Sequence, residues 1–145
     1  MPIITVAELE TKLYAEVITE ITRGDIAIAE IAIATAEQEC KMYLSRYDLT
    51  QLFGTGTTPP AVQDEYLKSI VKDVACWHLL RLNNTGVEYS TNRVAYTDAV
   101  EVLKSIKTGA LQPDGWPYKD AGNNTALPES NAINWNSNPK RSNHY

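Results

Sequence analysis

Two cysteines and two histidines are the side chains of this sequence best suited to chemistry at neutral pH. Cys40 and Cys76 lie inside apolar helical patterns without a CxxC motif, which predicts two buried free thiols in a reducing compartment. A disulfide between them stays open, because it requires only that their helices pack side by side. His78 follows Trp77 in an apolar segment, where a histidine is typically a core or interface residue. With His144 as the fourth such residue, the sequence predicts no metal site.

The carboxylates do not have the spacing of an acid–base pair. Glu37 and Glu39 are two residues apart and would point to different faces of a helix. Asp64 and Glu65 fall in the first turn of an expected helix, where acidic residues favour the helix dipole. The glycine-rich loop at Gly54 follows no strand and precedes no lysine, so it is not a phosphate cradle. The sequence therefore predicts no enzyme and no cofactor.

Charge is distributed unevenly along the 145 residues, whose net charge is -5. The first 110 residues carry 15 acidic and 10 basic residues, whereas the last 35 carry three of each. A nucleic-acid-binding face needs clustered Lys and Arg, so this composition argues against direct binding to nucleic acid. No apolar run approaches the ~20 residues that span a bilayer, so we expect no membrane partner.

Apolar residues recur at helical spacing in four segments, which predicts an all-α fold. We expect a small four-helix bundle with one long central helix, and place the helices over residues 5–20, 25–47, 60–83 and 92–108. Apolar side chains cover more than half the girth of the second helix, so it should pack against neighbours on two sides. Residues 48–60 contain turn-forming residues without periodicity and are expected to be a loop.

Capping signals support these boundaries. Thr5 and Glu8 have the spacing of a capping box, and Asp25 is suited to cap the second helix. Pro60 is suited to the first position of the third helix, and Gly109 to the end of the fourth.

Residues 111–145 differ in composition from the expected helical domain over residues 1–110. Four prolines and seven asparagines disfavour both helix and regular strand. The segment nevertheless contains two of the three tryptophans, and a tryptophan left in water is unusual. We therefore expect an extended arm that is ordered by docking, either on its own helices or on a neighbouring molecule.

Several short motifs occur in a definite order along the chain. In order they are Tyr43-Leu44-Ser45-Arg46-Tyr47, Pro59-Pro60, Leu67…Ile70…Asp73-Val74-Ala75…His78-Leu79-Leu80 and Arg93…Tyr96…Ala99…Leu103…Ile106…Gly109. A last stretch from Ile133 to Arg141 combines Ser, Pro and basic residues with Trp135. Together these motifs resemble the small helical proteins of Mu-like and related tailed phages and prophages that are grouped with head–tail connector (adaptor) proteins. The likeness covers residues 5–109, and the tail departs from it because Ser142 replaces the usual aromatic residue.

The resemblance implies a structural protein of the phage virion without enzymatic activity. Members of this family form rings, commonly of about twelve copies, between the portal and the tail. The implied partners are further copies of the chain, the portal protein and a head-completion or tail-completion protein. The implied location is the head–tail interface of the virion, and the host cytoplasm during assembly. Because Trp and Arg are typical of interface hot spots, we expect the arm to bind its partner through Trp116, Tyr118, Trp135, Pro139 and Arg141.

Two other interpretations stay open. The first is another small helical protein–protein interaction module of phage or prophage origin, active in tail completion or regulation. It would be a defined monomer or dimer with its tail folded onto its own body. The second is an enzyme or ligand-binding protein, which would need a polar pocket with perturbed titrating groups around His78 and Cys76.

Overall fold

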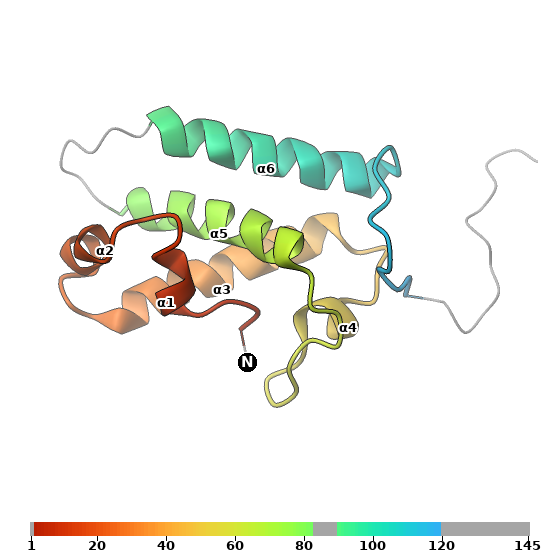
Figure 1. Cartoon of the computed structure of the whole chain (residues 1–145), viewed down its shortest axis with the longest axis horizontal. Coiled ribbons are helices and arrows are strands. Elements are labelled where there is room, and N and C mark those ends of the chain that lie inside the picture. The colour runs from red at the N-terminus through yellow and green to blue at the C-terminus, as the bar shows by residue number, and fades with distance from the viewer. Residues whose placement is uncertain (1, 83–89, 120–145) are drawn as a thin grey trace, which may run out of the picture.

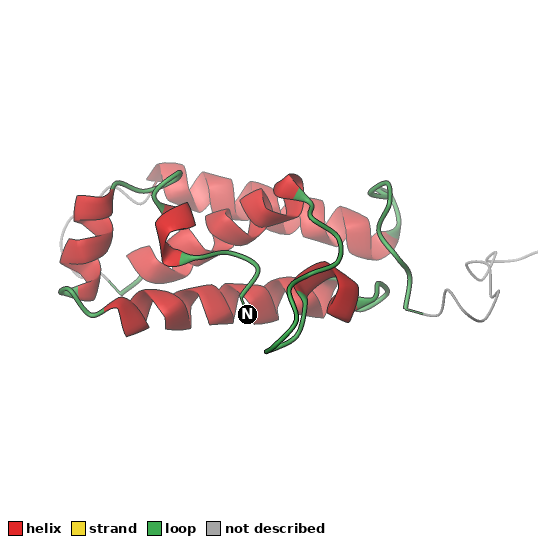
Figure 2. Cartoon of the chain, turned by 60° about the horizontal axis from the view of Figure 1, so that its bottom comes forward, coloured by secondary structure: helices red, strands yellow, loops and turns green. Residues whose placement is uncertain are grey.

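The computed structural model of the chain describes residues 2–82 and 90–119. Within these ranges the protein is all α-helical, as the sequence predicts, but it has six helices where four are expected. Their bounds are α1 (Val6–Leu9), α2 (Ala15–Thr22), α3 (Ile26–Tyr43), α4 (Leu49–Phe53), α5 (Glu65–Leu80) and α6 (Ser90–Thr108). Figure 2 shows the long helices lying roughly alongside one another, with short helices and loops at one side.

The centre of the bundle is α5. It packs against α3, α6, α1 and α2, and Figure 1 shows it running between α6 and α3. Its buried side chains are Leu67, Ile70, Val71, Val74, Ala75, Cys76, Leu79 and Leu80. The sequence predicts instead that the second helix is both longest and central. In the structure α3 has 18 residues against 19 in α6. It packs against α5, α2, α6 and α1, although large apolar side chains on one of its faces remain exposed.

The helix expected over residues 5–20 is in fact two short helices, α1 and α2. The break follows Thr11, whose hydroxyl donates a hydrogen bond to the carbonyl of Glu8 at 2.8 Å. Lys12 in the same turn forms an ion pair with Asp73 of α5 at 3.0 Å. These contacts bend the chain over the central helix, and a local periodicity cannot signal them.

Three predicted helix boundaries are confirmed. The carboxylate of Glu8 reaches back to accept the backbone amide of Thr5 at 2.7 Å, which satisfies a donor at the start of α1. Asp25 caps α3 by accepting the amide of Ala27 at 3.0 Å. Gly109 follows α6 with a φ of 83°, a left-handed conformation that glycine adopts without strain.

Two aspartates correct the expected boundaries between residues 48 and 64. Asp48 accepts the amides two and three residues further on, at 3.0 and 3.2 Å, and so caps α4 inside the expected loop. Asp64 caps α5 in the same way, at 2.8 and 3.0 Å. The third helix therefore begins after Asp64 and not at Pro60. A carboxylate that accepts hydrogen bonds from two otherwise unpaired amides fixes the start of a helix more strongly than the restricted φ of a proline does.

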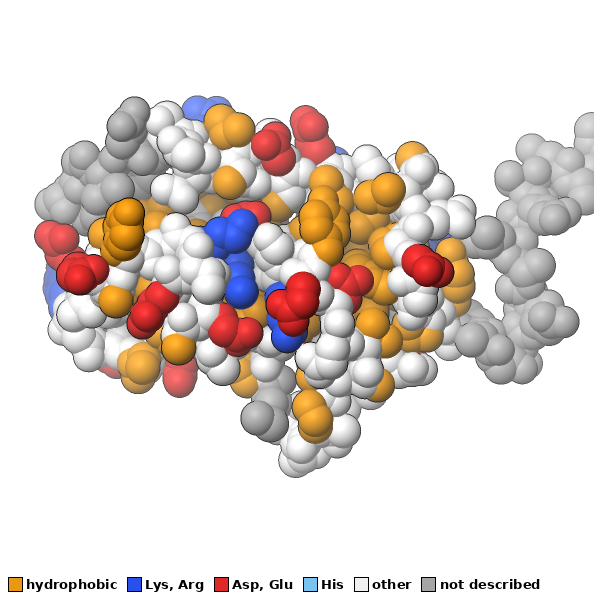
Figure 3. Space-filling view, viewed as in Figure 1, with side chains coloured by type: hydrophobic (Ala, Val, Ile, Leu, Met, Phe, Trp, Pro, Cys, Tyr) orange, Lys and Arg blue, Asp and Glu red, His pale blue; other side chains and the backbone are white. Residues whose placement is uncertain are grey.

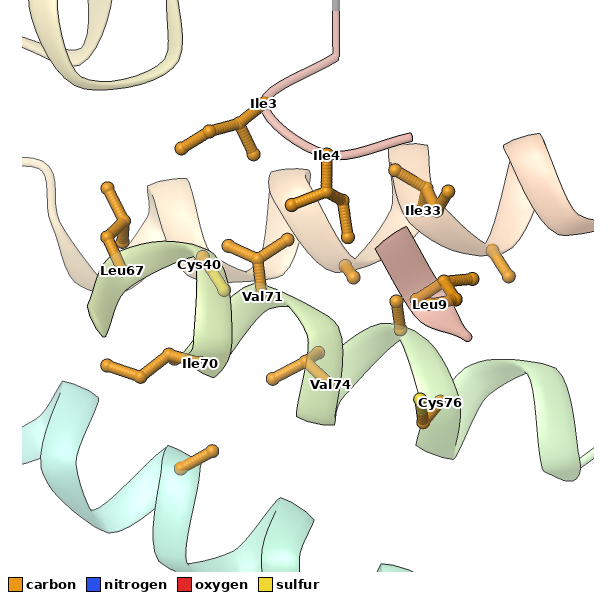
Figure 4. Close-up of a cluster of buried hydrophobic side chains, with 14 of the residues drawn as sticks. Ile3, Ile4, Leu9, Ile33, Cys40, Leu67, Ile70, Val71, Val74 and Cys76 are labelled. Carbon is orange, nitrogen blue, oxygen red and sulfur yellow. The ribbon is translucent and has the colours of Figure 1, made fainter. Parts of the chain in front are cut away.

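The N-terminal segment completes the core on the side of α1. Figure 4 shows Ile4 pointing between α3 and α5, and its side chain is fully buried. The backbone amide of the preceding Ile3 donates to a carboxylate oxygen of Glu37 at 2.6 Å. Glu37 is 8% exposed and also lies 3.6 Å from Lys41, so its charge is paired at the edge of the core.

We expect the Glu37→Ala variant to lose about 1–3 kcal/mol of unfolding free energy, because the buried amide of Ile3 loses its acceptor. Glu30→Ala, one heptad earlier on an exposed face of the same helix, should change stability by less than about 0.5 kcal/mol. Urea unfolding followed by circular dichroism measures both. Equal losses in the two variants would show that the Glu37 contact does not hold the N-terminal segment.

Candidate interaction surfaces

The segment after α6 packs against the end of the bundle. Trp116 is only 5% exposed, and its indole Nε1 donates a hydrogen bond to Asp64 at 2.5 Å. Asp64 therefore serves two purposes, because its other carboxylate oxygen caps α5. The folded body thus extends beyond residue 110, the boundary that the composition predicts. Composition marks the change of residue types, but it does not show that the tryptophan has a place in the core.

Backbone pairing fixes the direction in which this segment runs. The amide of Asp48 donates to the carbonyl of Pro117 at 2.8 Å, and the amide of Lys119 donates to the carbonyl of Arg46 at 3.1 Å. The two stretches are therefore antiparallel, and the chain passes from the start of α4 towards the end of α3. Because residues 46–48 serve this pairing, α3 ends at Tyr43 instead of continuing to residue 47 as the sequence predicts.

The aromatic side chains of this segment pack against Tyr47. Trp116 stands edge-on to it with 5.4 Å between ring centroids, and Tyr118 stacks on it at 4.9 Å. Burial, followed by the hydrogen bond with Tyr118, raises the pKa of the Tyr47 phenol. Of the five residues expected to bind a partner, Trp116 and Tyr118 thus contact their own chain. The other three, Trp135, Pro139 and Arg141, lie outside the described residues.

The outward face of α3 carries an uncharged stripe, which we call the α3 stripe and define as Ile31, Thr35, Gln38 and Met42. Their spacing of four, three and four residues places them in one row along the helix. Ile31 is 65% exposed and Met42 is 68% exposed. Isolated apolar residues on a surface are ordinary. Here two large apolar residues lie in one uncharged row with Thr35 and Gln38 between them, which makes the row a candidate contact surface. The sequence predicts packing on two sides of this helix: Ile28 and Ala32 of the expected second side pack into the core, whereas Ile31 stays exposed.

A second apolar area lies at one end of the bundle. Figure 3 shows hydrophobic side chains gathered over the region where α5 begins and α6 ends. The exposed side chains there include Tyr66, in the first turn of α5, and Leu111, just after α6. We call these two residues the end patch. It lies on a different part of the molecule from the α3 stripe.

A groove of about 610 Å³ separates the N-terminal segment from α3 and from the loop after α4. Its apolar floor exposes Pro2, Val6 and Ala34, beneath which Ile4, Ile33 and Phe53 are buried, and Glu30 and Lys41 lie at its sides. The ammonium group of Lys41 lies over the ring of Phe53, 5.1 Å from the centroid. This cation–π contact and the pairing of Lys41 with Glu37 fix the Lys41 side chain at the side of the groove.

The loop wall of this groove depends on one glycine. Gly54 has a φ of 73°, and a Cβ atom at this position would collide with the backbone of Thr58. The loop closes here through the amide of Thr55, which donates to the carbonyl of Thr58 at 2.8 Å. The sequence predicts a turn at Gly54. In the structure, this glycine allows two stretches of backbone in the loop to approach each other closely.

His78 belongs to a polar tie between three helices. Its Nε2 lies 2.7 Å from one carboxylate oxygen of Glu39 on α3, and the hydroxyl of Tyr96 on α6 donates to the other at 2.8 Å. The Tyr96 ring also stacks on Trp77 with 5.4 Å between centroids. Burial and the hydrogen bond to Glu39 raise the pKa of Tyr96 to about 12. The arrangement joins α3, α5 and α6 at a partly buried site.

The cysteines take no part in this tie. Both are buried free thiols, as the sequence predicts. Burial, with a smaller contribution from neighbouring carboxylates, raises the pKa of Cys40 and of Cys76 to about 12. A thiol with such a pKa stays protonated at neutral pH and is a poor nucleophile or metal ligand. An enzyme would need a polar pocket around His78 and Cys76. The polar contact that the structure shows there is the one between His78 and Glu39.

Sequence reasoning missed Glu39, Tyr96 and Tyr47 as contact residues. Glu39 is 39 residues from His78 and 57 from Tyr96, so no local spacing links them. Tyr47 is 69 residues before Trp116, and the sequence predicts that it lies inside a helix. Only its position at the end of an apolar run, next to the turn residue Asp48, indicates that the chain reverses there.

Comparisons with protein-family models, with curated proteins and with solved structures give no match for this chain. Within residues 2–82 and 90–119, no three or more His, Cys, Asp or Glu residues are grouped so as to hold a metal ion. In the same part of the chain, no helix has the length and apolar character needed to cross a bilayer. The function is therefore inferred from the surfaces and from the motifs of the chain itself.

We expect Asp64→Ala to destabilise the protein by about 2–4 kcal/mol, because it removes both the cap of α5 and the acceptor of the Trp116 indole. Asp25→Ala is the matched control, since Asp25 caps α3 without contacting a distant side chain and its loss should cost about 1 kcal/mol. Urea unfolding followed by tryptophan fluorescence measures both. The shared role of Asp64 is contradicted if the two variants lose the same stability.

Alkaline pH should weaken the tie through Tyr96. Its pKa is about 12 in the folded protein, against about 10 in an unfolded chain, so the folded state holds this proton more tightly. The stabilising contribution is complete below pH ~10 and is lost as the pH rises towards 12. We therefore expect Tyr96→Phe to lose less stability between pH 9 and pH 11 than the wild type does, whereas Tyr14→Phe, at an exposed position, should follow the wild type. Parallel curves for all three proteins would contradict this role.

Proposed function

We propose that this protein is a structural virion protein of a tailed phage or prophage, a head–tail connector (adaptor) subunit. In this proposal it assembles as a ring homo-oligomer between the portal and the tail and catalyses no reaction. Its partners are further copies of itself, the portal protein and a head-completion or tail-completion protein. It acts at the head–tail interface, after assembly in the cytoplasm of the bacterial host.

The uncovered α3 stripe is the observation that carries the proposal. In a ring, each subunit uses two different surfaces, one for each neighbour. The α3 stripe and the end patch are two such surfaces on different parts of one bundle. Both are apolar enough to gain free energy when covered, and neither is covered by the described part of the chain.

The positions that carry the resemblance to connector proteins also support the proposal. Leu103 and Ile106 of the last motif are fully buried, and Gly109 ends α6. Tyr47, which ends the first motif, receives Trp116 and Tyr118. The shared motifs thus coincide with the residues that build this bundle and close its end, which is what a common architecture requires.

A second candidate is a small helical interaction module of phage or prophage origin that acts in tail completion or regulation. The buried Trp116 favours it, because an arm that folds onto its own body is expected of such a monomer or dimer. The two candidates differ in assembly: the connector forms closed rings, whereas the module stays a monomer or dimer.

We expect light scattering over a concentration series to show oligomers of the wild-type chain, and negative-stain electron microscopy to show closed rings. The double variant Ile31→Lys and Met42→Lys should be monomeric, because two buried charges in an interface cost more than the contact gains. Val94→Lys is the control, since Val94 is 58% exposed on α6, outside both apolar areas.

Circular dichroism should give the same helix content for the wild type and both variants, which separates lost assembly from lost folding. A wild-type chain that is monomeric or dimeric at every concentration would overturn the connector proposal in favour of the interaction module. Rings that persist in the double variant would exclude the α3 stripe as the subunit contact.

A further inference from the structure

We infer that the groove between the N-terminal segment, α3 and the loop after α4 receives residues 120–145 of a neighbouring copy of this chain. The inference rests on the proposed ring, in which each subunit passes a segment to the next. It names the contact that the tail makes, which the connector proposal leaves open.

The groove is built before any partner arrives. Its N-terminal wall is tied to α3 by the hydrogen bond from Ile3 to Glu37 at 2.6 Å. Its floor is apolar, and its volume of about 610 Å³ lies in the range of sites that bury large side chains. Ala34 lies on the α3 side of the groove and is exposed, so a bulky side chain there would fill the groove without disturbing the core.

The charge and residue types of the tail complement this groove. Residues 120–145 contain the apolar side chains Leu127, Ile133 and Trp135, and after Glu129 their only charged side chains other than the C-terminus are Lys140 and Arg141. At the side of the groove, the carboxylate of Glu30 is exposed and forms no ion pair with another residue of the described ranges. A tail that places its tryptophan on the apolar floor therefore has two cations available for an unpaired carboxylate.

The direction of the chain favours a neighbour's groove over the chain's own. Pairing of residues 117–119 with residues 48–46 carries the chain away from α4, whose end forms one wall of the groove. In Figure 1 this segment lies at the right-hand end of the body, with the N-terminus and the loop after α4 to its left. The 26 residues that follow Lys119 can span up to ~86 Å, about three times the ~27 Å length of α3. The tail is therefore long enough to reach the next subunit of a ring.

Site-specific photo-crosslinking in the full chain tests this contact. Asn136→p-benzoyl-phenylalanine places the probe beside Trp135 without removing it. Light and heavy isotope-labelled chains are mixed, irradiated and analysed by mass spectrometry. We expect cross-links between light and heavy chains that map to accessible groove residues such as Pro2 and Val6.

Two alanines of α3 give a matched pair of variants. Ala34→Arg fills the groove and should reduce the yield of these cross-links about tenfold or more. Ala27→Arg lies on the same helical face two turns earlier, outside the groove, and should leave the yield unchanged. Equal yields in the two variants would overturn the inference.

A charge exchange tests the polar part of the contact. Glu30→Lys alone and the pair Lys140→Glu with Arg141→Glu should each lower the yield several-fold, and combining all three should restore it. A combined variant no better than the worse of the two would overturn the pairing.

The outcomes separate this inference from the connector proposal. Rings without cross-links to the groove overturn the inference and leave the connector standing. Cross-links only within one chain overturn the assignment to a neighbour. A chain that never assembles overturns the connector, and the inference with it.

Discussion

The central helix α5 can be buried only if separate parts of the chain cover it from several sides, and this requirement orders the rest of the structure. Its apolar side chains point in more directions than a single partner helix can cover. Accordingly α3 and α6 pack along it, and the N-terminal segment with α1 closes a third side. Polar contacts at the edges then hold these segments in place around α5. Lys12 pairs with Asp73, His78 with Glu39, and Asp64 binds the indole of Trp116.

The parts of the fold that local signals control were predictable. The all-α class follows from helical periodicity, and the starts of α1 and α3 follow from Glu8 and Asp25, whose carboxylates act within three residues of themselves. The break between α1 and α2 was not predictable, because the segment between them contacts a distant part of the chain: Lys12 pairs with Asp73, 61 residues away in the sequence. The same holds for the end of α3, which is set by pairing with residues that follow α6. The cap at Asp48 was predictable in principle, but the turn-forming residues that follow it outweighed its signal.

The candidate surfaces divide in the same way. The breadth of the apolar face on residues 25–47 predicted packing on two sides. Ile28 and Ala32 of the second side pack against the core, and only Ile31 of that side lies in the exposed α3 stripe. The unusual placement of tryptophan in a Pro- and Asn-rich tail predicted docking, and Trp116 does dock, on its own chain. The groove was not predictable, since its walls come from the N-terminal segment, the middle of α3 and the loop at Gly54. No pattern within one of these segments indicates that they meet.

The way the polar side chains are used favours assembly over catalysis. Glu37 binds the backbone of Ile3, Glu39 binds His78 and Tyr96, and Asp64 binds Trp116. These carboxylates are occupied in joining elements of the bundle, and both thiols are held protonated by burial. A reacting group must be able to change its partner during a reaction, and these groups would release a structural contact by doing so. Beside exposed charged side chains, the described part of the chain also presents three areas with exposed apolar side chains: the α3 stripe, the end patch and the groove. Such surfaces gain free energy when another chain covers them, which is the physical basis for proposing that this protein acts in an assembly.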